Sequence, residues 1–151
     1  MFVYEAKHLL LDGLANRSDA LLDVELGKSC LTEIAHRIGM TVIHPAVGVE
    51  FPHNGTSSAV RLNPSTRLPQ QQMSGYSAFV LLAESHLSIH TFPEASFLTF
   101  DFYSCVAFET AQVVEILEAV FDLGQREVRV ADRHFSSAGT LSMPSRQALS
   151  E

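Results

Sequence analysis

The 151-residue sequence carries a formal net charge of −7, and 46% of its residues are hydrophobic and 18% charged. This balance is typical of a folded chain, so we expect a single domain over residues 1–151. The acidic charge argues against a nucleic-acid partner, because phosphate binding needs a basic face. No apolar stretch reaches the roughly 20 residues of a membrane span, and no basic-then-apolar leader opens the chain. A cytoplasmic protein without a membrane partner is expected.

The first third of the chain predicts a strand followed by a helix. Residues 7–12 are typical of a short strand, and residues 18–38 show helical spacing. Apolar side chains recur there at every fourth position: Leu22, Leu26, Cys30, Ile34 and Ile38. Ser18 suits the start of this helix and Gly39 its C-terminal cap. Gly27 within this range leaves a second possibility open, in which the segment is divided into a turn and a main helix.

The middle of the chain predicts two strands joined by a long connection. Residues 41–51 are rich in β-branched side chains and predict a strand. Residues 52–73 are polar and rich in Pro, Ser, Asn and Gln, which indicates a long insertion within the domain. Residues 77–83 are apolar without alternation, as in a central strand that is buried on both faces.

The last third predicts a strand, a helix and a final strand. Apolar and polar side chains alternate over residues 98–103, which favours a half-buried strand. Helical spacing returns over residues 108–123 and ends at Gly124. Residues 127–130 predict the last strand, and the small polar residues 136–151 predict a flexible tail.

The resulting order is β-α-β-β-β-α-β, which predicts the α+β class. We expect a two-layer sandwich in which two helices cover one face of an antiparallel sheet. The other face of the sheet then needs a cover, and a homodimer would supply it.

Reactive side chains are concentrated in residues 83–94, Ala-Glu-Ser-His-Leu-Ser-Ile-His-Thr-Phe-Pro-Glu. On a helix, His86 and His90 would lie one turn apart and share a metal. The period-two pattern favours a strand instead, with Leu87 and Ile89 on one face and both histidines on the other. No third ligand is evident, and the two cysteines of the chain form no CxxC pattern, so no metal is expected.

These twelve residues resemble the processing-site motif of the bacterial and archaeal S-adenosylmethionine decarboxylases, which are pyruvoyl-dependent enzymes of polyamine synthesis. Ser77 and the apolar run after it match the serine and strand that precede the motif in this family. Residues 101–105, Asp-Phe-Tyr-Ser-Cys, match its strand that ends in a cysteine, and residues 7–12 match its first strand. The resemblance covers residues 7–135 apart from the insertion.

The resemblance implies a proenzyme that cuts itself between Glu84 and Ser85. The Ser85 hydroxyl attacks the preceding carbonyl, and the ester that forms is eliminated to leave a pyruvoyl group. The family assigns Ser77 to assisting this shift and His90 to acting as the base, a role that suits a group that titrates near neutrality. The pyruvoyl group then forms a Schiff base with the substrate, and Cys105 is the expected proton donor in the decarboxylation.

The resemblance also implies a substrate, S-adenosylmethionine, used for spermidine synthesis. Glu94 matches the carboxylate that holds the ribose, and Phe51 lies about where the family places a ring that stacks on adenine. Phe51 is not preceded by the usual histidine, and residues 52–76 replace the short lead to the serine. Because this departure concerns substrate binding, arginine and ornithine remain alternative substrates. An inactive relative that regulates a partner is a third possibility, although the retained processing residues argue against it.

The directions of the Ser85 and His90 side chains constrain the predicted self-cleavage. In one unbroken strand Ser85 would point to the same side as Leu87 and Ile89, opposite to His90. The chain must therefore bend at Glu84, or His90 must lie on a separate strand that turns back.

Overall fold

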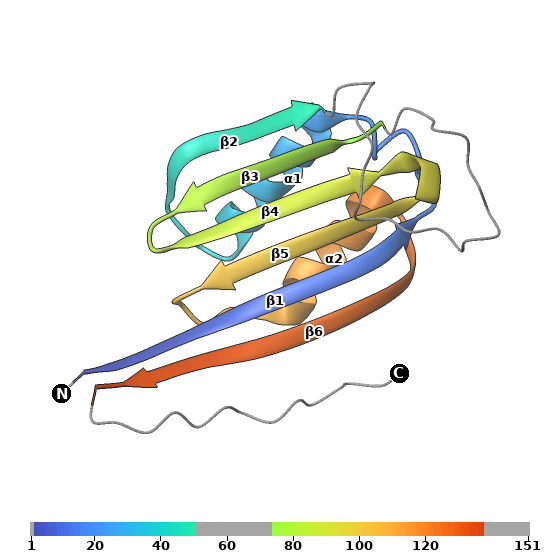
Figure 1. Ribbon diagram of the computed structural model, residues 1–151. Helices are drawn as coiled ribbons and strands as arrows, with labels where there is room; N and C mark the ends of the chain where they lie inside the picture. Colours follow the sequence, from blue (N-terminus) through green and yellow to red (C-terminus); the bar gives the residue numbers. More distant parts are fainter. Residues whose placement is uncertain (1, 51–73, 138–151) are drawn as a thin grey trace.

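The computed structural model describes residues 2–50 and 74–137 (Figure 1). The elements in chain order are β1 (Val3–Ala15), α1 (Val24–Arg37), β2 (Val42–Glu50), β3 (Tyr76–Leu82), β4 (Ser85–Phe92), the 3₁₀ turn η1 (Pro93–Ala95), β5 (Phe97–Ser104), α2 (Thr110–Phe121) and β6 (Leu123–Ser136). The strands form one antiparallel sheet in the order β2-β3-β4-β5-β1-β6. Phe51 and the ranges 52–73 and 138–151 lie outside the described residues.

Both helices lie against the same face of the sheet, which makes two layers (Figure 1). The core fills the space between them, with Leu9 and Phe100 from the strands and Leu31 and Leu117 from the helices fully buried. The predicted fold class is therefore confirmed. Neither helix in the described part has the length and apolar character that a membrane crossing needs.

The sheet has one strand more than the predicted order, because residues 85–92 form a strand of their own. β4 turns back from β3 through a two-residue loop and pairs with it from Leu82–Ser85 to Ser77–His90. The prediction that His90 lies on a strand separate from that of Ser85 is wrong, because both residues lie on β4. The chain does bend at Glu84, where φ is 63°, but the bend precedes Ser85 and leaves the two side chains on opposite faces of the sheet.

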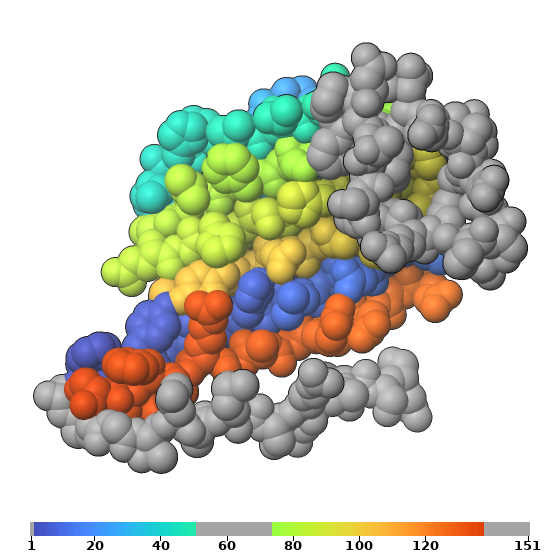
Figure 2. Space-filling model, in the orientation of Figure 1, coloured from blue at the N-terminus to red at the C-terminus, as the bar shows by residue number. Residues whose placement is uncertain are grey.

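The prediction that residues 77–83 are buried on both faces is wrong. Side chains of β3 alternate, and Phe79 and Leu81 are 43% and 42% exposed. Figure 2 shows the strands of this second face, with no helix of the described chain over them. We call this the open face. The apolar side chains of β3 that point there account for the continuous apolar run in the sequence.

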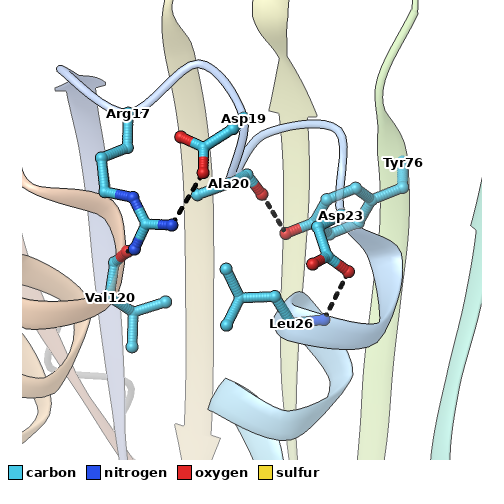
Figure 3. Close-up of polar contacts among 7 residues, drawn as sticks. All are labelled: Arg17, Asp19, Ala20, Asp23, Leu26, Tyr76 and Val120. Carbon is cyan, nitrogen blue, oxygen red and sulfur yellow. Dashed lines mark hydrogen bonds and ion pairs between the residues drawn. The ribbon is translucent and has the colours of Figure 1, made fainter.

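The first helix begins later than predicted, at Val24 and not near Ser18. The carboxylate of Asp23 accepts the amide hydrogen of Leu26 at 2.9 Å and caps the helix, and Figure 3 shows this contact. The carbonyls of Ala20 and Leu21, just before the cap, accept hydrogen bonds from strand side chains instead of helical amides. The predicted C-terminal glycine, Gly39, follows the last residues of α1 with φ of 73°.

The end of the chain also differs from the prediction. α2 ends at Phe121 and its C-terminal cap is Asp122, which has φ of 50°, so Gly124 is not the cap and lies within β6. β6 has 14 residues where only residues 127–130 were predicted, because it pairs with β1 along almost its whole length. Exposed, polar side chains dominate β6, and such an edge strand gives little periodic signal.

Candidate active site

The β3–β4 hairpin places the bond between Glu84 and Ser85 at one end of the sheet. Its loop is Ala83-Glu84, and Ser85 is the first residue of β4. Glu84 has φ of 63°, a left-handed conformation that costs a residue with a side chain roughly 1–3 kcal/mol. Hairpin loops of two residues usually have positive φ at their first position, whereas here only the second has it. The backbone is therefore bent just before the predicted cleavage point.

Ser85 and Cys105 meet at this bend, although 20 residues separate them in the chain. β4 and β5 are neighbours in the sheet, with His86 opposite Tyr103, so the start of β4 lies beside the end of β5. The Cys105 amide donates to Ser85 Oγ at 3.3 Å, and the Cys105 thiol donates to the Glu84 carbonyl oxygen at 3.1 Å. Ser85 is only 7% exposed. The structure thus brings together three of the predicted site residues.

Two tyrosines that the sequence did not single out surround the Cys105 thiol. The hydroxyl oxygens of Tyr4 and Tyr103 lie 3.2 and 3.6 Å from Cys105 Sγ. The pKa of Tyr103 is raised, first by its hydrogen bond with Cys105 and then by burial. Tyr103 lies on β5, two residues before the cysteine that follows this strand, so strand spacing alone could have identified it. Tyr4 could not be found this way, because only the pairing of β1 with β5 brings it close.

A pocket of about 390 Å³ opens beside Cys105, between β1, β6 and the loop after β5. It is lined by charged groups of both signs together with the cysteine: Glu5, Lys7, Cys105, Asp132, Arg133 and His134. A small zwitterion suits such a lining, because each of its charges would meet an opposite one.

Ser77 and His90 form a second group at the other end of the hairpin. Ser77 Oγ lies 2.7 Å from His90 Nδ1, and the two residues are directly opposite each other on β3 and β4. Both side chains face the open side of the sheet, while Ser85 faces the helices with Leu87 and Ile89. Five residues of extended strand separate Ser85 from His90 by roughly 17 Å. Within one chain the structure does not bring this pair to Ser85.

Glu94 lies at the same end as Ser77 and His90, in the 3₁₀ turn after β4. Its Oε1 accepts hydrogen bonds from the Ser74 amide at 2.6 Å and the Ser74 hydroxyl at 2.5 Å. Burial would raise the pKa of the Glu94 carboxyl, but the bonds from Ser74 outweigh it and hold the pKa below its usual value. The carboxylate is exposed and has oxygen lone pairs free for further hydrogen bonds.

The described residues contain no group of three or more His, Cys, Asp or Glu placed to hold a metal ion. His8 Nε2 and Asp101 Oδ1 lie 3.0 Å apart on the open face, as a pair of two potential ligands.

Comparison with known proteins identifies the family. The sequence model of the S-adenosylmethionine decarboxylase family matches residues 7–134. The chain belongs to the S-adenosylmethionine decarboxylase family. The match includes all the predicted site residues and every described element except the first residues of β1 and the last residues of β6.

Curated members of the S-adenosylmethionine decarboxylase family share moderate identity with the chain. The S-adenosylmethionine decarboxylase proenzyme of Brevibacillus brevis is 32% identical over 99 residues, which is 66% of this chain and 59% of that protein. The proenzyme of Clostridium botulinum strain Loch Maree is 23% identical over 127 residues, covering 83% of this chain and 91% of its own. The match therefore spans less than two thirds of the Brevibacillus relative's length.

A solved structure of the same family has the same fold. The crystal structure of the adenosylmethionine decarboxylase from Aquifex aeolicus matches with a TM-score of 0.63 and 23% identity. The alignment covers 94% of this chain and 97% of that one. The α+β sandwich described above is therefore the fold of this relative too.

Proposed function

We propose that the chain is a self-processing, pyruvoyl-dependent S-adenosylmethionine decarboxylase that cuts itself between Glu84 and Ser85. Membership of the family supports the reaction, and the names of its relatives describe proenzymes. The observation that carries the proposal is the contact of the Cys105 thiol with the Glu84 carbonyl oxygen, next to the Ser85 hydroxyl. A hydrogen-bond donor on that oxygen is what an attack on the carbonyl carbon requires.

Self-cleavage follows from the groups at this bend. Ser85 Oγ bonds to the Glu84 carbonyl carbon and the C–N bond breaks, which turns the amide into an ester. The Cys105 thiol stabilises the charge that develops on the carbonyl oxygen during this shift. A base then removes the α-proton of residue 85, and the Glu84 carboxylate leaves. Uptake of one water and loss of one ammonia complete the pyruvoyl group.

In the proposed mechanism, the base of the elimination step comes from a second copy of the chain. His90 is the assigned base, yet it lies roughly 17 Å from Ser85 along its own strand. In a homodimer whose open faces meet, the Ser77–His90 pair and Glu94 of one copy would complete the Ser85–Cys105 end of the other. The exposed apolar side chains of β3 on the open face support such a contact.

Decarboxylation would take place where Cys105 meets the pocket. A pyruvoyl group supplies a carbonyl that condenses with the substrate amine and accepts the electron pair freed when the carboxylate leaves. The charged lining of the pocket would bind the amino-acid part of the substrate, and the Cys105 thiol would return a proton to its α-carbon. Glu94 would accept hydrogen bonds from the ribose hydroxyls. Phe51 remains the proposed adenine contact.

Denaturing mass spectrometry of the purified protein tests the proposal. We expect two chains, residues 1–84 and 85–151, the second blocked at its N-terminus, with a summed mass of the intact chain plus one water minus one ammonia. Ser85→Ala should stay intact. Ser88→Ala is the matched control, because Ser88 lies on the same strand but faces the open side, and it should cleave like the parent. A single intact parent chain after prolonged incubation would overturn the proposal.

Carbon dioxide release identifies the substrate. We expect release from S-adenosylmethionine and none above background from arginine or ornithine when all three are assayed side by side. Release of carbon dioxide only from arginine or ornithine, by a correctly cleaved protein, is the alternative outcome. That result would support the pyruvoyl mechanism but show that S-adenosylmethionine is not the substrate. Cleavage without release from any of the three would contradict the decarboxylase assignment.

A further inference from the structure

The Cys105 thiol has three oxygen neighbours but only one proton. The Glu84 carbonyl oxygen is 3.1 Å away, the Tyr4 hydroxyl 3.2 Å and the Tyr103 hydroxyl 3.6 Å. A carbonyl oxygen can only accept, whereas a phenolic hydroxyl can donate or accept. If the thiol proton goes to Glu84, the two tyrosines can still bond to the sulfur, but only as donors.

The Tyr103 ring is held by side chains from three other strands. His86 on β4 stacks on it, with centroids 5.4 Å apart and an interplanar angle of 28°. The Arg133 guanidinium from β6 lies 5.0 Å from the ring centroid, and His8 from β1 meets the ring edge-on at 6.1 Å. A guanidinium in such a position attracts the ring. The direction of the Tyr103 hydroxyl is therefore set by packing and not by the sulfur alone.

A thiol on an unhindered side chain rotates and points its proton at any acceptor within reach, and both tyrosine oxygens are acceptors too. Donation from Tyr103 and Tyr4 would occupy the sulfur lone pairs and remove those two oxygens as targets for the thiol proton. The remaining acceptor is the Glu84 oxygen. The arrangement selects one of several hydrogen-bonding patterns, and that pattern is the one that polarises the bent peptide.

We propose that Tyr103, assisted by Tyr4, is a positioning residue that directs the Cys105 thiol proton onto the Glu84 carbonyl oxygen. The proposal rests on the self-cleavage proposed above and adds two residues to it. Tyr103 acts only through Cys105 and contacts neither Ser85 nor the Glu84 carbonyl in the described contacts. Loss of the Tyr103 hydroxyl should therefore change the hydrogen bonding of the Cys105 thiol without changing the fold.

The infrared S–H stretch of Cys105 tests the positioning directly, in an uncleaved Ser85→Ala chain. The sequence has only two cysteines, so subtracting the spectrum of the Ser85→Ala, Cys105→Ala chain leaves the band of Cys105. Tyr103→Phe keeps the ring and removes the hydroxyl, and we expect the band to move to higher wavenumber as donation to Glu84 weakens. The chain has three tyrosines, and Tyr76→Phe, which removes a hydroxyl bonded to the Ala20 carbonyl, should leave the band in place.

The rate of self-cleavage is the second measurement, made with Ser85 restored. Tyr103→Phe should slow cleavage roughly 3- to 10-fold, as expected for one net hydrogen bond, and the Tyr4, Tyr103 double variant should be slower still. Arg133→Met, which frees the ring, should slow cleavage in the same direction. Arg129→Met is its matched control, because Arg129 lies on the same face of β6 but pairs with Asp12, and it should cleave like the parent.

The outcomes separate this inference from the function on which it rests. An unshifted S–H band in Tyr103→Phe, or parental cleavage by that variant, overturns the positioning role while leaving self-cleavage intact. A parent chain that never cleaves overturns the proposed function, and the infrared measurement then still tests the hydrogen bond. If Tyr103→Phe fails to fold, Arg133→Met and Tyr4→Phe carry the same test.

Discussion

The two cysteines have opposite environments, although both lie on regular elements or at their ends. Cys30 is 3% exposed within the core, and burial together with the nearby Glu33 charge raises the pKa of its thiol to about 12. Cys105 follows β5, is partly exposed and hydrogen-bonds to Glu84 and two tyrosines. The thiolate is the reactive form, so the core position makes Cys30 inert.

Alkylation of the native Ser85→Ala chain with iodoacetamide near neutral pH should therefore modify Cys105 at least about tenfold faster than Cys30. Peptide mapping by mass spectrometry gives both rates from one sample. In denaturant the two thiols should react alike, which controls for any difference in intrinsic reactivity. Comparable rates in the native chain would mean that Cys30 is not buried as described.

The segment before α1 shows how the sheet holds its helices in place. The Tyr76 hydroxyl donates to the Ala20 carbonyl at 3.3 Å, and the Thr91 hydroxyl donates to the Leu21 carbonyl at 2.8 Å. Figure 3 shows Tyr76 reaching Ala20 beside the Asp23 cap, with Arg17 close to Asp19 and the Val120 carbonyl. These bonds satisfy backbone carbonyls that a longer helix would have used. For this reason the helical pattern that begins at Ser18 forms a helix only from Val24 onward.

Gly27 lets α1 lie directly on Tyr76. A Cβ at this position would come within 2.4 Å of the Tyr76 ring, a distance that real Cβ atoms do not show. Because Tyr76 is fully buried and its hydroxyl is bonded, the ring cannot move aside. We expect Gly27→Ala to lower the free energy of unfolding by about 1–3 kcal/mol, measured by urea denaturation.

Gly13→Ala is the control for the Gly27 substitution. Gly13 lies on β1, and a Cβ there would meet its neighbours at an ordinary 3.5 Å. Its unfolding midpoint should stay near that of the parent. Equal midpoints for the two variants would contradict the tight packing of Gly27 on Tyr76.

At the scale of the whole molecule, the proposed machinery is divided between the two ends of one hairpin. Glu84, Ser85 and Cys105 lie at the turn, while Ser77 and His90 lie at the far end on the open face. β4 is one extended strand, so within a single chain it keeps the two groups apart, and the proposed second copy of the chain would bring them together. The proposed role of His90 as the base therefore depends on the proposed homodimer.

Mixing two inactive chains tests this dependence. Neither Ser85→Ala nor His90→Ala alone should produce the blocked chain 85–151. Coexpressed, they should form mixed dimers in which the His90→Ala chain, which keeps Ser85, is processed by His90 of the other copy. Mass spectrometry distinguishes the two chains by their substitutions.

The control for the mixing experiment replaces Ser85→Ala by the Ser85→Ala, His90→Ala double variant, which offers no histidine and should restore no cleavage. Mixed dimers that form but yield no blocked chain would show that His90 does not act across the interface.

Local pattern in the sequence was enough for much of this protein. The helical spacing around Leu31 and Leu117 predicted both helices, and alternation predicted β5, because side-chain periodicity depends only on neighbouring residues. The fold class followed from the order of these elements. The twelve residues that end at Glu94 pointed to the family, since a dense motif at fixed spacing is a property of the sequence itself.

The tertiary structure alone decided which groups meet. Periodicity does not give the pairing partner or the register of a strand, so the sequence could not show that Tyr4 reaches Cys105 or that β3 is open on one side. The sequence places Ser85 and His90 in one motif, only five residues apart, and so suggests that they form one site. The pairing of β3 with β4 puts them at opposite ends and on opposite faces of a rigid hairpin, because an extended strand separates residues along its length and alternates their directions.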